Sequence, residues 1–117
     1  MIYVGTDLVE VDRIRSAVEK WPQRFLERIF TPEEITYCQR QPRPALHFAG
    51  RFAAKEAVKK ALYSAGHPAP VLFRQIHIDR DTGGVPRVTV TGLERQPQVS
   101  ISHVTHHAVA TALFEAP

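Results

Sequence analysis

The stretch that decides the fold is Gly50-Arg51-Phe52-Ala53-Ala54-Lys55-Glu56-Ala57-Val58-Lys59-Lys60, which lies in a helical segment that is otherwise apolar almost all round. At about 100° per residue, Glu56 falls between Phe52 and Ala49, where a core helix would carry leucine. A carboxylate that is desolvated there without a partner is strongly destabilising. Its partner is therefore either a cation, such as Lys60 at i+4 on a half-exposed face, or a metal ion.

Length and composition indicate one domain that spans residues 1–117. A chain of 117 residues with 44% hydrophobic residues is large enough for one core but not for two. No apolar run approaches the roughly 20 residues of a membrane span, and no signal-peptide pattern opens the chain. Cys38 is the only cysteine, which excludes an internal disulfide and a cysteine-rich metal site and leads us to expect a cytoplasmic location. The net charge of +3 allows an anionic partner.

The first half of the chain predicts a strand followed by helices. Residues 2–11 alternate and are rich in Val and Ile, which favours a strand, and a helix is expected from about 12 to 21 with a further turn or two over 24–30. Thr31, Pro32 and Glu34 form a capping box for a helix that ends before residue 41. A long central helix is expected from about 45 to 65, closed by Gly66.

The second half of the chain is predicted to be β. Residues 76–79 and 87–91 alternate on either side of the turn sequence Asp81-Thr82-Gly83-Gly84, a pattern typical of a hairpin. Residues 99–103 and 108–113 form a second strand pair. We therefore expect an α+β domain: an antiparallel β-sheet with a long central helix and shorter helices packed on one face.

Asp7 is the second carboxylate with unusual surroundings. Aspartate is uncommon in strands, so Asp7 either caps local N–H groups at a bulge or strand end, or is a ligand together with Glu56. Two carboxylates with open coordination positions suit Mg²⁺, which takes its other ligands from water and phosphates. The cations of the central helix either form a solvated face or surround Glu56 and neutralise a bound diphosphate. They are Arg51, Lys55, Lys59 and Lys60.

Three histidines follow the predicted strand over 99–103. A zinc site made by His103, His106 and His107 is one alternative, although no cysteine supports it. The favoured interpretation is that His103 faces a cleft and that the other two lie in a turn.

Three blocks of the chain carry a family resemblance. They are Gly5-Thr6-Asp7-Leu8-Val9-Glu10-Val11-Asp12-Arg13-Ile14, then Gly50-Arg51-Phe52-Ala53-Ala54-Lys55-Glu56-Ala57 with Lys60-Ala61-Leu62, then Val99-Ser100-Ile101-Ser102-His103. Together and in this order they resemble the bacterial holo-acyl-carrier-protein synthases, which are small 4′-phosphopantetheinyl transferases. The resemblance runs from about residue 2 to 113.

This resemblance implies a fold, an activity and an assembly. The fold would be 4′-phosphopantetheinyl transferase-like. The activity would transfer the phosphopantetheine arm of coenzyme A to a serine of apo acyl carrier protein, release adenosine 3′,5′-bisphosphate and support fatty acid biosynthesis. Nothing in the sequence separates a fatty-acid carrier from a polyketide carrier. A homotrimer with sites between subunits is also implied, and the alternating Ala108, Ala110 and Ala112 predict a flat strand face for subunit packing.

The resemblance also implies roles for single residues. Asp7 and Glu56 would bind Mg²⁺, with Glu56 or a water as general base, and Lys60 would neutralise phosphate charge. Arg51 and His103 would line the nucleotide side of coenzyme A. Gly66 is the one glycine left in the loop where the family usually carries a Gly-Thr-Gly run, so it would contact phosphate. The surface that docks the carrier would comprise Arg13, Arg24, Phe25 and Arg28.

Two other functions remain open at this point. The chain could be a basic module that binds protein or nucleic acid, although its cations do not interleave with exposed aromatics and no nucleic-acid motif appears. It could also be a Mg²⁺-dependent phosphohydrolase that uses Asp7 and Glu56 with water as the nucleophile.

Overall fold

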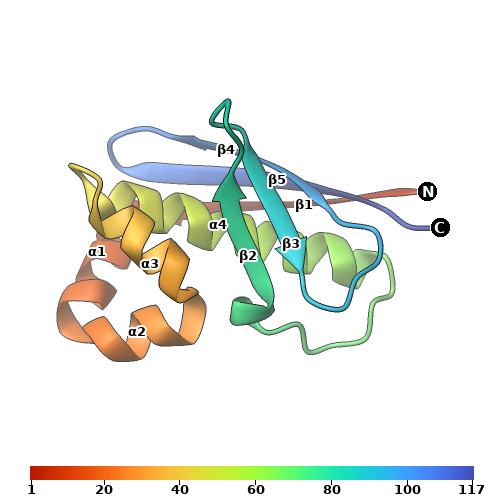
Figure 1. The fold of residues 1–117 in the computed structure, drawn as a ribbon, viewed down its shortest axis with the longest axis horizontal. Coiled ribbons are helices and arrows are strands. Elements are labelled where there is room, and N and C mark those ends of the chain that lie inside the picture. The colour runs from red at the N-terminus through yellow and green to blue at the C-terminus, as the bar shows by residue number, and fades with distance from the viewer.

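A long helix, α4 (Pro44–Ser64), runs through the middle of the computed structural model, which describes residues 1–117. Three antiparallel strands lie along it in the order β1-β5-β4: β1 (Ile2–Glu10), β5 (His107–Glu115) and β4 (Gln98–His103). Three short helices gather near the start of α4 (Figure 1): α1 (Val11–Lys20), α2 (Pro22–Ile29) and α3 (Pro32–Gln39). The predicted α+β class is confirmed, and the predicted element bounds are close to those observed.

The second hairpin forms a sheet of its own. A 3₁₀ turn, η1 (Phe73–Gln75), leads into β2 (Ile76–Arg80), which pairs only with β3 (Pro86–Val90), and the two strands cross in front of α4 (Figure 1). The expectation of one sheet is therefore wrong. The backbone of this hairpin pairs with no strand of the other sheet, and its inward side chains fill the core; they are Ile76, Ile78, Val88 and Val90.

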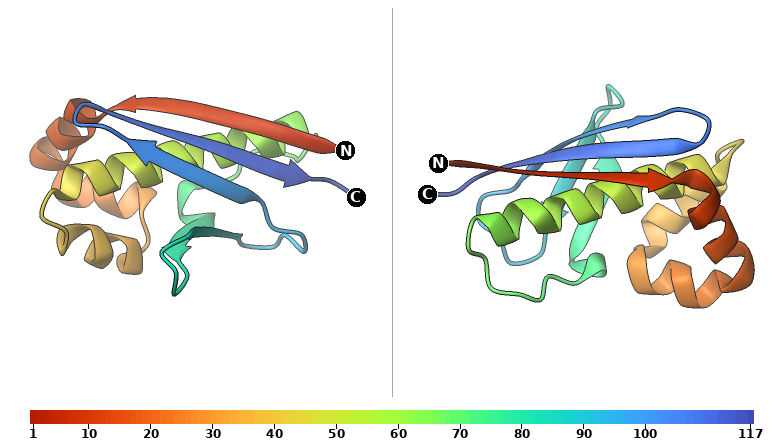
Figure 2. Two further views of the ribbon diagram at one scale, coloured as in Figure 1. Left: turned by 90° about the horizontal axis from the view of Figure 1, so that it is seen from above. Right: turned by 180° about the vertical axis from the view of Figure 1, so that it is seen from behind.

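The three-stranded sheet lies directly on α4, as the two views of Figure 2 show, and small residues allow this close approach. Ala108, Ala110 and Ala112 of β5 are at most 1% exposed. On β1, a Cβ at Gly5 would collide with the carbonyl oxygen of Ala57 on α4. The expectation that the alanine face packs against another subunit is therefore wrong, because that face is needed for close contact with the helix. The opposite face of the sheet is the exposed one.

The predicted capping box is present at the start of α3. The Thr31 hydroxyl accepts a hydrogen bond from the Glu34 amide (3.3 Å), and the Thr31 amide donates to Glu34 Oε1 (2.8 Å). At the other end of the central helix, Gly66 has φ +87°, a conformation that favours glycine, and it follows the last turn of α4 as expected.

Glu34 has a second role that the capping pattern does not reveal. Its Oε1 accepts a hydrogen bond from Lys55 Nζ (2.6 Å), and neither side chain has any exposed surface. Lys55 also donates to the carbonyl oxygens of Ile29 and Phe73, while Glu34 Oε2 accepts from the Ile78 amide. Burial lowers the pKa of Lys55, and the charge of Glu34 opposes that shift. This network joins α2, α3, η1 and β2 to α4.

Candidate functional site

A cavity of about 550 Å³ lies where the edge of β1 meets α4 and the first two helices. Asp7 lines it from β1 and Glu56 lines it from α4. The fold thus brings together the two carboxylates that the sequence singled out. Much of the remaining wall is apolar, and the other lining residues are Leu8, Val9, Glu10, Arg13, Ile14, Ala17, Phe25, Phe52 and His107.

Asp7 has a cationic neighbour from α4. Its carboxylate, 17% exposed, accepts a hydrogen bond from Lys60 Nζ at 3.2 Å, and Lys60 also donates to the Thr6 carbonyl at 3.0 Å. The Lys60 side chain is 53% exposed, so this ion pair is screened by solvent and contributes little to stability. The i,i+4 pair between Lys60 and Glu56 that the sequence offered as an alternative does not form.

Glu56 is half-buried and makes no ion pair or side-chain hydrogen bond in the structure. Because a half-buried carboxylate without a partner is costly, its position on the same cavity as Asp7 fits a shared cation. Two hard oxygen donors on an open cavity match the requirements of Mg²⁺. No group of three or more His, Cys, Asp or Glu side chains is arranged to hold a metal ion, so the three histidines make no such site either.

The other cations of α4 do not surround Glu56, contrary to one interpretation of the sequence. Lys55 is buried against Glu34. The Lys59 ammonium lies over the Phe73 ring at 3.4 Å from its centroid, and the Arg51 guanidinium lies over the Tyr37 ring at 4.2 Å. These side chains leave the helix in other directions, so only Lys60 reaches the carboxylate site.

Arg51 and His103 belong to a separate cluster. Arg51 is 3% exposed and its Nε has no hydrogen-bond partner. The His103 ring, at the end of β4, lies 6.0 Å from the ring of His47 on α4. Because β5 separates β4 from β1, the strands that carry His103 and Asp7 are about 10 Å apart across the sheet. A single chain therefore presents Asp7 and His103 on opposite edge strands of the three-stranded sheet, whereas Glu56 and Arg51 both lie on α4.

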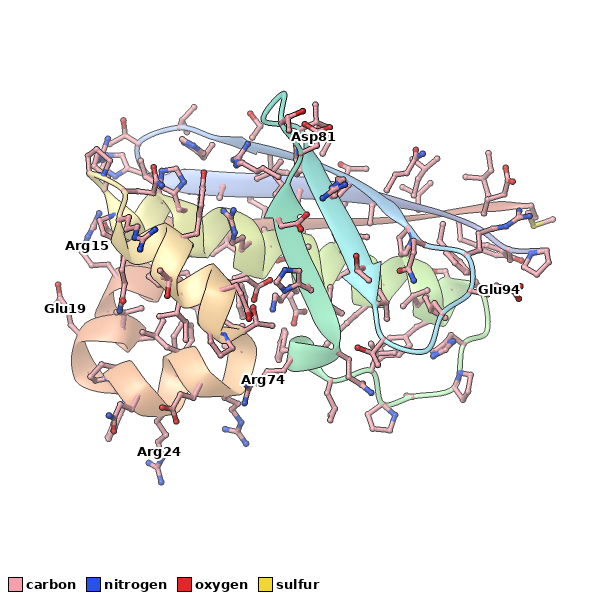
Figure 3. All side chains as sticks on the ribbon, in the orientation of Figure 1. Arg15, Glu19, Arg24, Arg74, Asp81 and Glu94 are labelled. Carbon is pink, nitrogen blue, oxygen red and sulfur yellow. The ribbon has the colours of Figure 1, made fainter.

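The predicted docking residues lie on α1 and α2. Arg24 extends into solvent (Figure 3), and its guanidinium lies 5.9 Å from the Trp21 ring centroid. A shallow pocket of about 200 Å³ is lined by Trp21, Arg24, Phe25 and Arg28. Phe25 also lines the large cavity, as does Arg13. The proposed docking surface is therefore continuous with the carboxylate site.

Gly66 is not near the carboxylates. It follows Glu56 by two to three helical turns, about 15 Å along the axis at 1.5 Å per residue, and does not line the cavity.

The sequence did not single out several residues that line the cavity, including Phe52, Glu10 and His107. Phe52 was detectable because it precedes Glu56 by one helical turn, whereas His107 is placed beside Glu10 only by the pairing of β1 with β5.

Comparison with known proteins identifies the family. The model of the 4′-phosphopantetheinyl transferase superfamily matches residues 3–113. The chain belongs to this superfamily. It is 42% identical to a holo-[acyl-carrier-protein] synthase of Protochlamydia amoebophila over 97% of both chains. It is 43% identical to one of Chlorobium limicola, with 95% of this chain and 91% of the relative covered.

Solved structures agree with this assignment. The holo-[acyl-carrier-protein] synthase of Neisseria meningitidis superposes with a TM-score of 0.86 at 34% identity, covering 99% of this chain and all of that one (100%). The Helicobacter pylori synthase, solved in complex with coenzyme A, gives a TM-score of 0.80 at 30% identity over 93% and 96% of the two chains.

These comparisons confirm the family that the sequence blocks resemble and its class, a phosphopantetheinyl transferase of the holo-acyl-carrier-protein synthase type. The predicted activity, transfer of phosphopantetheine from coenzyme A to an acyl carrier protein, is confirmed with it. None of the helices combines the length and apolar character that crossing a membrane requires.

Proposed function

We propose that this chain carries out the transfer at the cavity of Asp7 and Glu56, with these two carboxylates binding one Mg²⁺ that holds the pyrophosphate of coenzyme A. The observation that carries the proposal is the convergence of two carboxylates from distant segments on one cavity, where Glu56 has no protein partner. When bound, the metal would neutralise charge on the phosphate oxygens.

The residues of the cavity then have distinct tasks. The serine hydroxyl of the carrier attacks the phosphorus next to the pantetheine arm, and the bond to adenosine 3′,5′-bisphosphate breaks with its electron pair leaving on the nucleotide. Glu56 accepts the hydroxyl proton, directly or through a water. The Lys60 ammonium stabilises negative charge on the leaving phosphate. Phe25 and Phe52 form an apolar wall beside the reacting groups and limit the access of water.

The decisive experiment incubates the protein with apo acyl carrier protein, coenzyme A and Mg²⁺ and weighs the carrier by mass spectrometry. We expect a gain of one phosphopantetheine. Asp7→Ala and Glu56→Ala should abolish the gain without unfolding the protein, and a chelator should do the same to the wild type. Glu19→Gln, which changes an exposed carboxylate of α1, is the matched control.

Each contrary result has a clear meaning. Free phosphopantetheine with an unmodified carrier would show that water competes with the carrier serine as the nucleophile. Full activity of either carboxylate variant, or activity that resists the chelator, would refute the proposed metal site.

Lys60 should act on the rate and not on stability. Because its ion pair with Asp7 is half-exposed, Lys60→Ala should change the melting temperature little. Loss of one preorganised charge in the transition state should lower kcat by about 10²-fold, or about 2.7 kcal/mol, with little change in coenzyme A binding. Single-turnover rates and thermal melts measure both quantities. Lys59→Met on the neighbouring residue is the control, and a lower melting temperature with an unchanged rate would make Lys60 structural.

Carrier docking is proposed to use Arg13, Arg24, Phe25 and Arg28, whose surface adjoins the cavity. Because the charges are exposed, reversal of Arg24 or Arg28 to Glu should raise the KM for an acidic carrier far more than the KM for coenzyme A, and added salt should weaken wild-type docking. Arg87→Glu on β3 is the charge-matched control. Equal changes in the two KM values would argue against this surface.

We also propose that the active form is a homotrimer with its sites between subunits. Asp7 and His103 lie on opposite edge strands of the sheet, and a neighbouring copy that packs against this sheet would bring the Asp7 of one chain close to the His103 of another. The outer face of the sheet supports such an assembly, because Leu8, Val109 and Leu113 are 66%, 38% and 40% exposed. Leu8 pairs directly with Val109, which makes the apolar surface continuous across β1 and β5.

Charging this face should dissociate the assembly. Leu113→Lys places a cation in the proposed interface at a distance from the carboxylates, so it should give monomers that have lost transfer activity but keep their fold. Light scattering measures the assembly state, circular dichroism tests whether the fold is kept, and the carrier assay measures the transfer activity. Val85→Lys, an exposed apolar position outside the sheet face, is the control. A wild-type protein that is active as a monomer would contradict the shared site.

A further inference from the structure

The 3₁₀ turn η1 lies beside the end of α2, next to the proposed docking surface. One buried ammonium, Lys55 Nζ, donates to the carbonyl of Ile29 at 2.7 Å and to the carbonyl of Phe73 at 3.2 Å. Ile29 is the last residue of α2 and Phe73 is the first of η1. An exposed arginine adjoins each of them in the chain, Arg28 on α2 and Arg74 on η1. The fold therefore holds these two arginines on neighbouring segments.

The arginines of α2 and η1 have no ionic partner within the chain. Arg24, Arg28 and Arg74 are exposed, and none of them makes an ion pair. Figure 3 shows Arg74 beside the end of α2. Burial lowers the pKa of Lys55, and the charge of Arg74 adds to that shift, so the guanidinium is within electrostatic reach of this ammonium. Glu27 is the one carboxylate on either segment, which leaves a net positive surface.

An exposed leucine lies next to these charges. Leu72 directly precedes η1 and is 58% exposed. Its amide donates to Gln75 Oε1 at 2.7 Å, and the amide of Val71 donates to the Tyr63 hydroxyl at 3.0 Å. Because these bonds hold the segment, the leucine loses little backbone entropy when a partner binds. Such a surface suits a protein partner that carries an apolar side chain close to carboxylates.

A row of phenylalanine rings connects η1 with the cavity. Phe73 stacks on Phe52 with 5.7 Å between the ring centroids, and Phe52 stacks on Phe25 at 6.4 Å. Phe52 and Phe25 line the cavity, and Phe25 also belongs to the proposed docking surface. A partner that reaches the cavity over α2 is therefore also next to η1.

We propose that η1 is a second part of the carrier-docking surface, on which Arg74 pairs with a carboxylate of the acyl carrier protein and Leu72 contacts an apolar side chain beside it. The inference rests on the proposed transfer site and extends its docking surface from α2 to η1. Contacts on two segments fix the orientation of the carrier better than contacts on one, and so direct its serine to the cavity. Arg74 and Leu72 are positioning residues that act on the carrier and not on coenzyme A.

The test measures transfer rates while the concentration of apo acyl carrier protein or of coenzyme A is varied. Arg74→Gln should raise the KM for the carrier about two- to fivefold, as expected for the loss of one exposed ion pair, and Arg74→Glu should raise it further. The KM for coenzyme A and kcat should change little. The carrier KM of Arg74→Gln should also depend less on salt than that of the wild type, which a merely structural role of the arginine would not produce.

The apolar contact has its own variant and control. Leu72→Ser should raise the KM for the carrier, whereas Val85→Ser, at a position of similar exposure (56%) in the β2–β3 turn, should not. Arg87→Glu on β3 is the control for charge reversal, and thermal melts verify the fold of each variant. A carrier KM for Arg74→Glu that equals that of Arg87→Glu would overturn the inference. An equal rise in the KM for coenzyme A would overturn it too.

Failure of the proposed function would look different. If the Asp7 or Glu56 variants kept full activity, the proposed metal site would be wrong whatever the result at η1. If Arg24→Glu and Arg28→Glu left the carrier KM unchanged while Arg74→Glu raised it, the docking surface on α2 would be wrong and the contact at η1 would stand.

Discussion

The arrangement of the helices depends on one buried ion pair, Lys55 with Glu34. Its two charges have no exposed surface, and their remaining hydrogen bonds go to backbone groups of α2, η1 and β2. Removing one partner of such a pair typically costs about 3–5 kcal/mol, since the other charge stays buried. Because Lys55 binds the carbonyl of Ile29 at the end of α2, it holds the proposed docking helix beside the helix that carries Glu56.

A second constraint determines the depth of the site. Glycine and alanine on β1 and β5 bring the sheet against α4, and this close approach places Asp7 within reach of Lys60. Larger inward side chains would push β1 away and separate the carboxylates. Because inward and outward positions alternate along a strand, the larger apolar residues of β1 and β5 lie on the outer face. The small inward residues allow close packing on α4, and the larger outward residues form the surface available for assembly.

The surroundings of each charged side chain of α4 depend on which segment covers that face of the helix. Lys55 is enclosed and pairs with Glu34; Arg51 and Lys59 lie on aromatic rings; Lys60 reaches solvent and Asp7. Glu56 keeps its carboxylate free on the cavity. A single helix therefore contributes to the stability of the fold, to the carboxylate site and to the separate cluster around His47 and His103.

Local pattern in the sequence determined much of this protein: the long helix, the capping box at Thr31, both strand pairs, and the choice of Asp7 and Glu56 as unusual carboxylates. The helix, the cap and the strand pairs depend on neighbours within a few residues, and the two carboxylates were recognised because their residue type is unusual in a strand or in an apolar helix. The partner of Lys60, the burial of Lys55, the inward direction of the β5 alanines and the contact of His47 with His103 were decided only by the tertiary structure. Helical spacing gives the direction in which a side chain leaves its helix, but the group that it meets there comes from a segment far away in the chain.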